Sequence, residues 1–354
     1  MRALLCLSTL GRLKLMVYIY NIHNKIRIRS DLDLELNYFR VNNIAGPFDL
    51  NIRIVGGILM GLSRLERICS NYFGLENQHF IIRRIRENPF RSEILLNNLL
   101  GETLLAITKH YYMTRYVLDF SSALAGSNLI QHILRIKMLL KGLTLLHCAC
   151  ISHKDSNTGI LLSAYPDVGK TTTTLLAVKS GLFEYLSDDE TIVDQNRIAW
   201  AFPKTLNIRN LEYTGFRIKS TLKRKLGSSM VSLIPWPLNT YLSKIEHINV
   251  KDVIPVKEHV PIRYIFILEA GQKSYKQLSK EECIRKLWLN NQRQYSCIPE
   301  LLNIYAYFNV NFDLEELINE EKSLISNLVY RSECFLIKEK NAKDFVNTLI
   351  ETFR

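Results

Sequence analysis

The sequence lacks the features that mark disulfide-stapled, zinc-binding, repetitive or disordered proteins. Its 354 residues include only seven cysteines, and the chain contains no internal repeat and no low-complexity tract. The cysteines are odd in number and scattered, which excludes a regular disulfide framework or zinc pattern. Cys148 and Cys150 have one residue between them and no second ligand pair nearby, so we expect both to be small core residues. These absences predict a cytoplasmic protein.

A long apolar run without charges is also missing. The first twenty residues are apolar, but Arg12 and Lys14 interrupt them and no small-residue cleavage site follows. The longest charge-free stretch there is well short of the roughly 20 residues that a membrane helix needs. We therefore expect no membrane span. A clean alternating pattern begins just after Met16, which makes Met16 an alternative start.

Positive charge is in excess, with a formal net charge of +12. Such a charge suits an anionic partner, but the basic residues are spread out and form only short clusters, such as residues 83–86 and 223–225. We interpret them as solvated faces and do not expect nucleic acid as a partner. The composition, 47% hydrophobic and 23% charged, is that of a folded protein, and the length favours two domains.

Three segments follow from the apolar patterns. Residues 1–75 form a sheet-rich N-terminal α+β module, because apolar residues alternate as in half-buried antiparallel strands at Ile26 and Ile28, at Leu32, Leu34 and Leu36, and at Ile52 and Ile54. Residues 76–140 form a helical connecting region, because apolar residues recur at helical spacing at Leu95, Leu96, Leu99 and Leu100, and again from Leu129 to Met138. Residues 141–354 form an α/β nucleotide-binding domain that ends in helices.

The third segment contains an eight-residue motif with the spacing of a phosphate-binding loop (P-loop, Walker A). A strand over residues 159–163 leads into the loop, and a helix follows it and closes at Gly181. Backbone N–H groups of such a loop bind phosphate, the lysine reaches the β- and γ-phosphates, and the hydroxyl after it ligates Mg²⁺. The predicted cofactor-binding residues are Ala164, Tyr165, Pro166, Asp167, Val168, Gly169, Lys170, Thr171 and Thr172. The alternative is a simple turn before a threonine-rich helix.

Two adjacent carboxylates follow a second strand over residues 183–187. Asp188 and Asp189 come 18 and 19 residues after Lys170. Acidic residues at the end of a neighbouring parallel strand are what Mg²⁺ needs in a nucleotide site. The alternative is a helix N-cap with favourable charges.

These residues resemble the HPr serine kinase/phosphorylase and phosphoenolpyruvate carboxykinase superfamily. The resemblance covers roughly 45 residues, from Leu145–Ala149 through Gly159–Ser163 and the loop to Ser187–Glu190. It implies a P-loop α/β core that binds ATP and Mg²⁺, with Lys170 on phosphate and Thr171 on the metal. It also implies that the aspartates divide between base and metal ligand, with Asp188 as the base and Asp189 on the metal, or the reverse. His147, on an expected strand from Leu143 to Ile151, would be the active-site histidine.

The sequence departs from the superfamily in two places. Alanine stands at the first loop position and Asp167 at the inner glycine position, and no glycine-rich signature segment follows. We therefore do not expect phosphorylation of HPr itself or a carboxykinase reaction. Arg209 is the remaining candidate for a cation that stabilises the transferred phosphoryl group.

The sequence thus predicts an ATP- and Mg²⁺-dependent kinase that phosphorylates a hydroxyl group, either a serine of a protein or peptide or a small molecule. The alternative is a non-catalytic ATP-binding regulatory or accessory protein. The expected partners are a nucleotide and an unidentified hydroxyl acceptor, and a homo-oligomer is left open.

Overall fold

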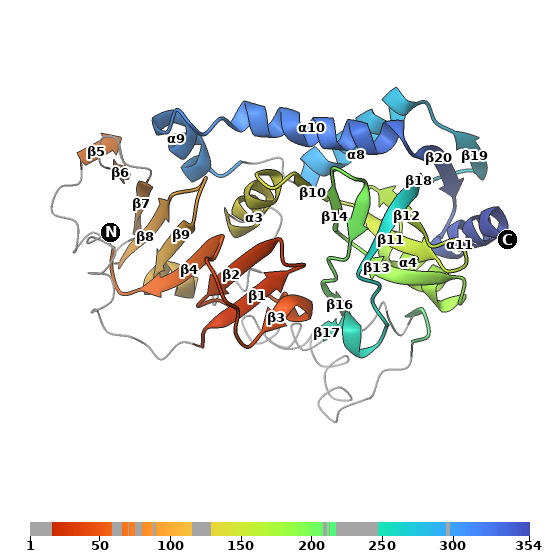
Figure 1. Cartoon of the computed structure of the whole chain (residues 1–354), viewed down its shortest axis with the longest axis horizontal. Coiled ribbons are helices and arrows are strands. Elements are labelled where there is room, and N and C mark those ends of the chain that lie inside the picture. The colour runs from red at the N-terminus through yellow and green to blue at the C-terminus, as the bar shows by residue number, and fades with distance from the viewer. Residues whose placement is uncertain are drawn as a thin grey trace. The chain divides into compact units, whose positions relative to one another are not determined.

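The computed structural model describes residues 16–58, 66–69, 71–74, 80–87, 90–114, 129–207, 211, 213–216, 247–294 and 298–354. The chain divides into two compact units, one comprising Met1–Lys141 and Cys297–Leu317, the other Gly142–Ser296 and Ile318–Arg354. Both contain helices and sheet, and the sheets mix parallel with antiparallel pairs, so the protein is α/β (Figure 1).

The first unit is built on a nine-stranded sheet with the order β3-β1-β2-β4-β9-β8-β7-β6-β5. Its strands are β1 (Tyr18–Ile22), β2 (Ile26–Ser30), β3 (Arg40–Val41), β4 (Leu50–Val55), β5 (Glu66–Cys69), β6 (Tyr72–Gly74), β7 (Phe80–Glu87), β8 (Phe90–Asn97) and β9 (Thr103–Thr108). The described helices of this unit are η2 (Asn37–Phe39), α2 (Lys109–Tyr112), α3 (Leu129–Leu139) and α9 (Glu300–Phe308).

The alternating pattern at the start of the chain does form strands. In β2, Ile26 and Ile28 are buried while Arg27 and Arg29 lie on the opposite, half-buried face, as a period of two requires. β1 pairs with β2 in the antiparallel sense that we expected, whereas β4 pairs in parallel with both β2 and β9.

The predicted strand at Leu32–Leu36 is wrong. This stretch is irregular, although Leu32, Leu34 and Leu36 are all buried. The neighbouring aspartates accept backbone N–H groups there, from Ile54 to Asp31 and from Glu35 to Asp33, and such side-chain bonds compete with a strand ladder.

The expectation of a helical region over residues 76–140 is wrong for its first half. Leu95 and Leu96 lie in β8 and are both buried, and Leu99 follows in a turn where its N–H donates to Tyr305. A strand buried on both faces also produces neighbouring apolar residues, so the spacing did not distinguish it from a helix. The helix predicted from Leu129 is confirmed as α3. The sheet crosses the boundary expected at residue 75, since β4 pairs with β9.

The second unit contains a branched sheet in which β18 joins two groups of strands. The main order is β10-β14-β15-β18-β12-β11-β13, and β20 pairs with both β18 and β19. The strands are β10 (Leu143–Leu146), β11 (Ala149–His153), β12 (Thr158–Ala164), β13 (Phe183–Ser187), β14 (Thr191–Asp194), β15 (Ile198–Trp200), β18 (His259–Ala270), β19 (Ser274–Gln277) and β20 (Glu333–Glu339). A separate two-stranded sheet joins β16 (Thr205–Asn207) to β17 (His247–Asn249).

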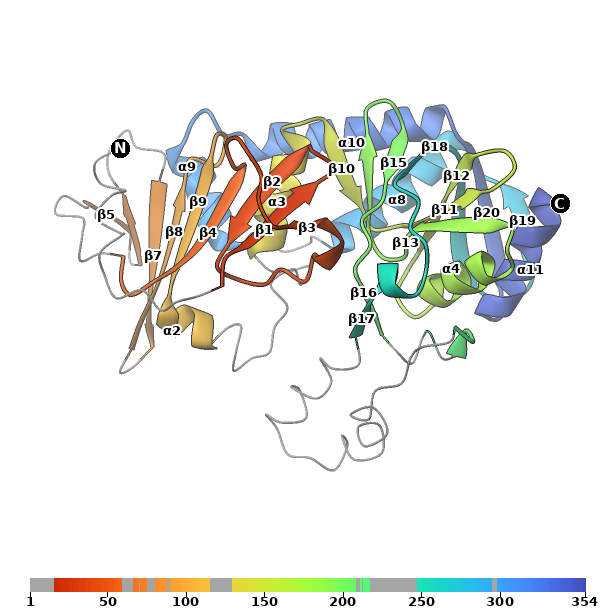
Figure 2. The ribbon, with the colours of Figure 1, turned by 60° about the horizontal axis from the view of Figure 1, so that its bottom comes forward.

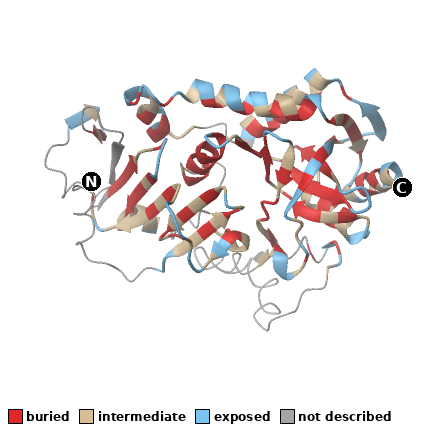
Figure 3. Ribbon diagram, in the orientation of Figure 1, coloured by how far each residue is buried: buried red, intermediate tan, exposed pale blue. Residues whose placement is uncertain are grey.

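Helices cover both faces of this sheet. They are α4 (Lys170–Lys179), α8 (Lys280–Gln294), α10 (Leu314–Tyr330), which lies in this unit from Ile318 on, and α11 (Ala342–Phe353), with the short η6 (Val250–Asp252). Figures 1 and 2 show α4 and α11 side by side, and these two helices are in contact. The strands between the helical layers are mostly buried (Figure 3). The helical part predicted from Ser279 on is confirmed, with β20 inserted between α10 and α11.

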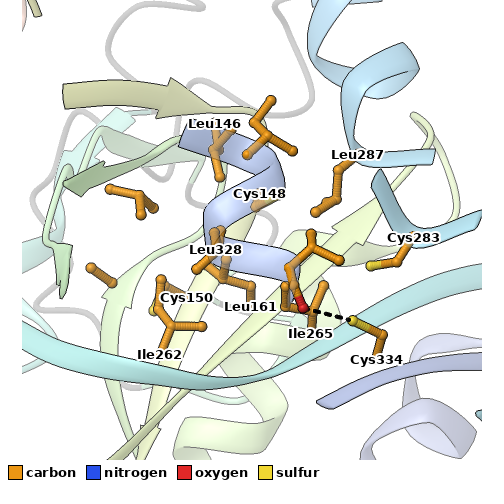
Figure 4. Packing of buried hydrophobic residues seen from close by; sticks show 14 of the residues in the cluster. Leu146, Cys148, Cys150, Leu161, Ile262, Ile265, Cys283, Leu287, Leu328 and Cys334 are labelled. Atoms are coloured by element: carbon orange, nitrogen blue, oxygen red, sulfur yellow. Dashed lines mark hydrogen bonds between the residues drawn. The ribbon is translucent and has the colours of Figure 1, made fainter. Parts of the chain in front are cut away.

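The side chains of each strand divide between the two helical layers. In β12, Leu161 packs with residues of α8 and α10, whereas Ile160 and Leu162 pack with residues of α4 and α11. Cys148 and Cys150 are buried in the α8 and α10 layer, as predicted for core residues, together with Cys283 and Cys334 (Figure 4). Strands covered on both faces read as continuous apolar runs, which is why they were recognisable in the sequence.

Candidate functional site

The loop between β12 and α4 reverses the chain with two left-handed residues. Asp167 has φ 65° and Gly169 has φ 100°, and α4 begins at Lys170. Glycine adopts this conformation at little cost and aspartate tolerates it better than most residues. Tyr165, Pro166 and Asp167 are exposed, and Gly169 caps the helix without a side-chain hydrogen bond. The first turn of α4 therefore has no side-chain cap.

Strand pairing brings the other predicted residues to one place. β10 pairs with β14 and β11 pairs with β13, both antiparallel. The connection at residues 147–148 leads from β10 to β11, and the connection at residues 188–190 leads from β13 back to β14. The two connections therefore run alongside each other, and His147 meets Asp189 across them, with His147 Nδ1 3.4 Å from Asp189 Oδ1.

Two sequence expectations need correction here. His147 lies at a bend between two short strands and not within a strand, because the chain passes there from one strand group to the other. The aspartates do not follow a strand adjacent to β12. β11 lies between β12 and β13 and is antiparallel to both, so β12 and β13 run in the same direction without pairing.

Lys170 and Lys204 are the two lysines that hold the carboxylates. Lys170 Nζ lies 3.3 Å from His147 Nε2, donates to the Asp189 carbonyl oxygen at 3.1 Å, and lies 3.7 Å from Asp189 Oδ1. Lys204 Nζ lies 2.9 Å from Asp189 Oδ2 and 2.8 Å from Glu190 Oε2. The Glu190 side chain is fully buried, whereas that of Asp189 is 36% exposed. Asp189 is thus shared by both lysines.

The pKa values of the two aspartates are shifted in opposite directions. Burial, reinforced by the neighbouring Asp189 carboxylate, raises the pKa of Asp188 from 3.8 to about 6. Burial would also raise the pKa of Asp189, but Lys204 and then Lys170 hold it well below its ordinary value. Asp188 Oδ1 accepts a hydrogen bond from the buried Tyr185 hydroxyl at 2.8 Å. At neutral pH, Asp189 is therefore ionised, and the pKa of Asp188 lies about one unit below the pH.

His147 is a buried, neutral imidazole. Burial, with Lys170 adding to it, lowers the pKa of His147 from 6.5 to about 4. Its Nδ1, although close to Asp189, has no partner with hydrogen-bond geometry among the described residues. The backbone of His147 is held by α8, since its N–H donates to Asn291 at 2.9 Å and its carbonyl accepts from Asn290 at 3.0 Å.

The remaining predicted residues lie in or near this loop with one exception. Ala164 ends β12, Val168 packs on the apolar layer under α4, and Thr171 and Thr172 are half-buried in the first turn of α4. The described residues offer the Thr171 hydroxyl no hydrogen-bond partner. Arg209 lies outside the described residues.

Sequence reasoning missed the residues that other elements bring to the site. Lys204 follows β15, Asn290 and Asn291 come from α8, and the guanidinium of Arg293 lies 5.5 Å from the centre of the Tyr165 ring. The only sequence signal for α8 was its general helical pattern, and Lys204 had none. Each is more than ten residues from the motifs, so only tertiary packing reveals it.

The described part of the chain holds no cluster of three or more histidine, cysteine or acidic residues arranged for a metal ion. A helix of the length and apolarity required to cross a membrane is likewise absent from the described residues.

The chain matches no protein-family model, and no curated protein matches it either.

Proposed function

We propose that this protein is an ATP- and Mg²⁺-dependent kinase that phosphorylates a hydroxyl group, with a P-loop core of the HPr kinase and phosphoenolpyruvate carboxykinase type. One observation carries the proposal. The lysine that begins α4 lies within 3.3 Å of His147 and contacts Asp189, so the three segments of the sequence resemblance converge on one ammonium group. A turn followed by a threonine-rich helix gives no reason for that convergence.

The residues present fit ATP and Mg²⁺. Gly169 leaves the N-terminus of α4 without a side-chain cap, and such an end attracts phosphate oxygens. Lys170 would bind phosphate. The Thr171 hydroxyl and the half-exposed Asp189 carboxylate would hold Mg²⁺, which needs few protein ligands because phosphate and water complete its shell. ATP would supply the phosphoryl group and Mg²⁺ would neutralise its charge.

Asp188 suits the role of general base. A base works best when its pKa lies near the operating pH, and burial raises the pKa of Asp188 to about 6. Asp189, held as an anion by Lys204 and Lys170, suits the metal. This difference supports the assignment of Asp188 as base and Asp189 as metal ligand over the reverse. Arg293, beside Tyr165 on the loop, joins Arg209 as a candidate cation for the transferred group.

One observation favours the alternative, a non-catalytic ATP-binding regulatory protein. Lys204 already places a positive charge between Asp189 and Glu190, at 2.9 and 2.8 Å. A built-in cation beside the metal-binding carboxylate would let the site bind nucleotide while Asp189 stays engaged. The depressed pKa of Asp189 serves either function.

ATP binding is tested first. Lys170→Ala should weaken the affinity for ATP with Mg²⁺ by at least about tenfold, because it removes the ammonium group from the phosphate site. The matched control is Lys179→Ala at the other end of α4, where the lysine donates to the carbonyl oxygens of Thr214 and Gly215. Calorimetry with a thermal melt measures both. Unchanged affinity in Lys170→Ala would remove the phosphate-loop interpretation.

Phosphate transfer is tested second. Asp188→Asn should keep ATP binding yet reduce transfer by the roughly 10²–10⁴-fold that general-base catalysis contributes. Asp189→Asn should instead weaken binding, and extra Mg²⁺ should partly restore it. ADP release with cell extract or a pool of serine-containing peptides gives the readout. A wild type that binds ATP but turns over no faster than either variant would favour the regulatory protein.

A further inference from the structure

A polar hollow lies on the sheet of the first unit. It has a volume of about 540 Å³ and is lined by Arg29, Asn51, Arg53, Asn97, Asn98, Glu102 and Leu104. Its lining comes from β2, β4, β8, β9 and the turn between the last two. All of these residues belong to the first unit, so the hollow is independent of the proposed function.

Four of the lining residues form a straight row across four strands. Arg29 pairs with Asn51, Asn51 with Leu104, and Leu104 with Asn97 in the registers of β2, β4, β9 and β8. Their side chains share one face of the sheet, and the adjacent residues Ile28, Leu50 and Leu105, which point to the other face, are buried. Three spacings between neighbouring strands make the row about 14 Å long.

The polar groups of the row are free to bind a ligand. Within the described chain, Arg29 makes no ion pair or hydrogen bond through its side chain, and the same holds for Asn51 and Asn97. All three are half-buried. Arg53 is engaged more weakly, with its Nε 3.8 Å from Asp31. A half-buried guanidinium and two amides without partners retain unsatisfied hydrogen-bonding capacity.

The charges in the hollow are unevenly distributed. Arg29 and Arg53 lie on β2 and β4, whereas Glu102 lies in the turn directly before β9, two residues before Leu104. A guanidinium pairs well with a carboxylate, and Glu102 favours a basic group. Asparagine side chains both donate and accept, which matches the alternating C=O and N–H groups of an extended backbone.

We propose that this hollow binds an extended peptide segment that carries a carboxylate over Arg29 and a basic side chain near Glu102. Glu102 lies two strand spacings across and two residues along from Arg29, which is about 12 Å, and an extended chain that advances about 3.3 Å per residue spans this distance in about four residues. The two charged residues of the ligand are therefore four positions apart, and Asn51 contacts the backbone between them.

The test uses the full chain and a rhodamine-labelled, amidated peptide, Gly-Glu-Ser-Gly-Ser-Lys-Gly, in fluorescence anisotropy. Two control peptides replace the glutamate by glutamine or place glutamate and lysine side by side in the same composition. We expect both to bind at least about tenfold more weakly, since a charge-assisted pair contributes roughly that factor. Raising the salt concentration should weaken the spaced peptide most.

Three variants locate the binding. Arg29→Gln should weaken the spaced peptide at least about tenfold without lowering the melting temperature, because Arg29 has no described ion pair to lose. Glu102→Gln should weaken the spaced peptide but not a version with glutamine in place of lysine. Arg40→Gln is the matched control, since Arg40 lies on β3 of the same sheet and stacks on Tyr18 outside the hollow.

Several results would overturn the proposal. Equal binding of the spaced and glutamine peptides would remove the role of the carboxylate. Displacement of the peptide by succinate or inorganic phosphate at the same concentrations would indicate a small-anion site. Tighter, Arg29-dependent binding of an oligothymidylate would indicate a nucleic-acid surface. The absence of binding at millimolar peptide would leave the hollow without this ligand.

Discussion

The pair between Lys204 and Glu190 makes the sharpest prediction about stability. The Glu190 side chain is fully buried and the Lys204 side chain is 24% exposed, with 2.8 Å between their charged atoms. Removing one partner of a buried pair leaves the other charge without compensation and costs about 3–5 kcal/mol. Because Lys204 keeps some exposure and Glu190 has a further interaction, we expect Lys204→Met to lower the free energy of unfolding by about 3 kcal/mol at most, the lower end of that range.

Urea unfolding at pH 7 measures this loss against two other variants. Lys257→Met removes a lysine that pairs with Glu184 at 2.5 Å, but those side chains are 23% and 36% exposed, so the loss should stay under about 1 kcal/mol. Combining Lys204→Met with Glu190→Gln should recover most of the stability, because position 190 then carries no buried charge. A loss in Lys204→Met no larger than in Lys257→Met would refute the reasoning.

The same substitution has a predicted pH dependence. Lys204 is the main group that holds the pKa of Asp189 below its ordinary 3.8, against the effect of burial. A carboxyl group whose pKa is lower in the folded state than in the unfolded state stabilises the fold at pH values above its unfolded-state pKa. This stabilisation is lost as the pH falls through the folded-state pKa. The difference between wild type and Lys204→Met should therefore shrink below pH 3.8. A difference that is constant down to acid unfolding would contradict it.

Three further predictions concern the site residues. Asp188→Asn should raise the free energy of unfolding at pH 7 by up to about 3 kcal/mol. The pKa of Asp188 is about 6 in the folded state and 3.8 in the unfolded state, so ionisation of the buried carboxyl at pH 7 destabilises the fold, and asparagine avoids this cost. Denaturant unfolding measures the gain, and a loss of stability would contradict the prediction. The wild type should lose stability as the pH falls from 6.5 to about 4, because the imidazole of His147 takes up a proton in the unfolded state but not in the folded state. His147→Asn should remove this loss. A stability difference between the two proteins that does not change over this pH range would contradict the prediction. Gly169→Ala should cost about 1–2 kcal/mol because of φ 100°, while Gly271→Ala, without a positive φ, should be nearly neutral in thermal melts.

The sequence by itself predicted the strand, loop and helix around Lys170. β12, the turn with Gly169, and α4 follow one another as expected, because apolar runs, a glycine and a helix start are local signals. The burial of Cys148 and Cys150 and the helix from Leu129 were predicted for the same reason. Each of these features could be predicted from residues close together in the sequence.

Ambiguous local patterns explain the errors in the first unit. Leu95 and Leu96 have the same spacing in a buried strand and in an amphipathic helix, and only their pairing with β7 and β9 decided between the two. The leucines from Leu32 to Leu36 alternate as in a strand, but the side chains of Asp31 and Asp33 take the backbone N–H groups nearby. A contact that competes for the same backbone is not visible in the apolar pattern.

Only the tertiary structure decided which residues surround Lys170. The sequence proposed His147 and Asp189, but their contact follows from the pairing of β10 with β14 and of β11 with β13. Lys204 reaches Asp189 and Glu190 from beyond β15, and Asn290 and Asn291 hold the His147 backbone from α8. Single lysines and asparagines carry no periodicity, so their roles are fixed only when distant elements pack together.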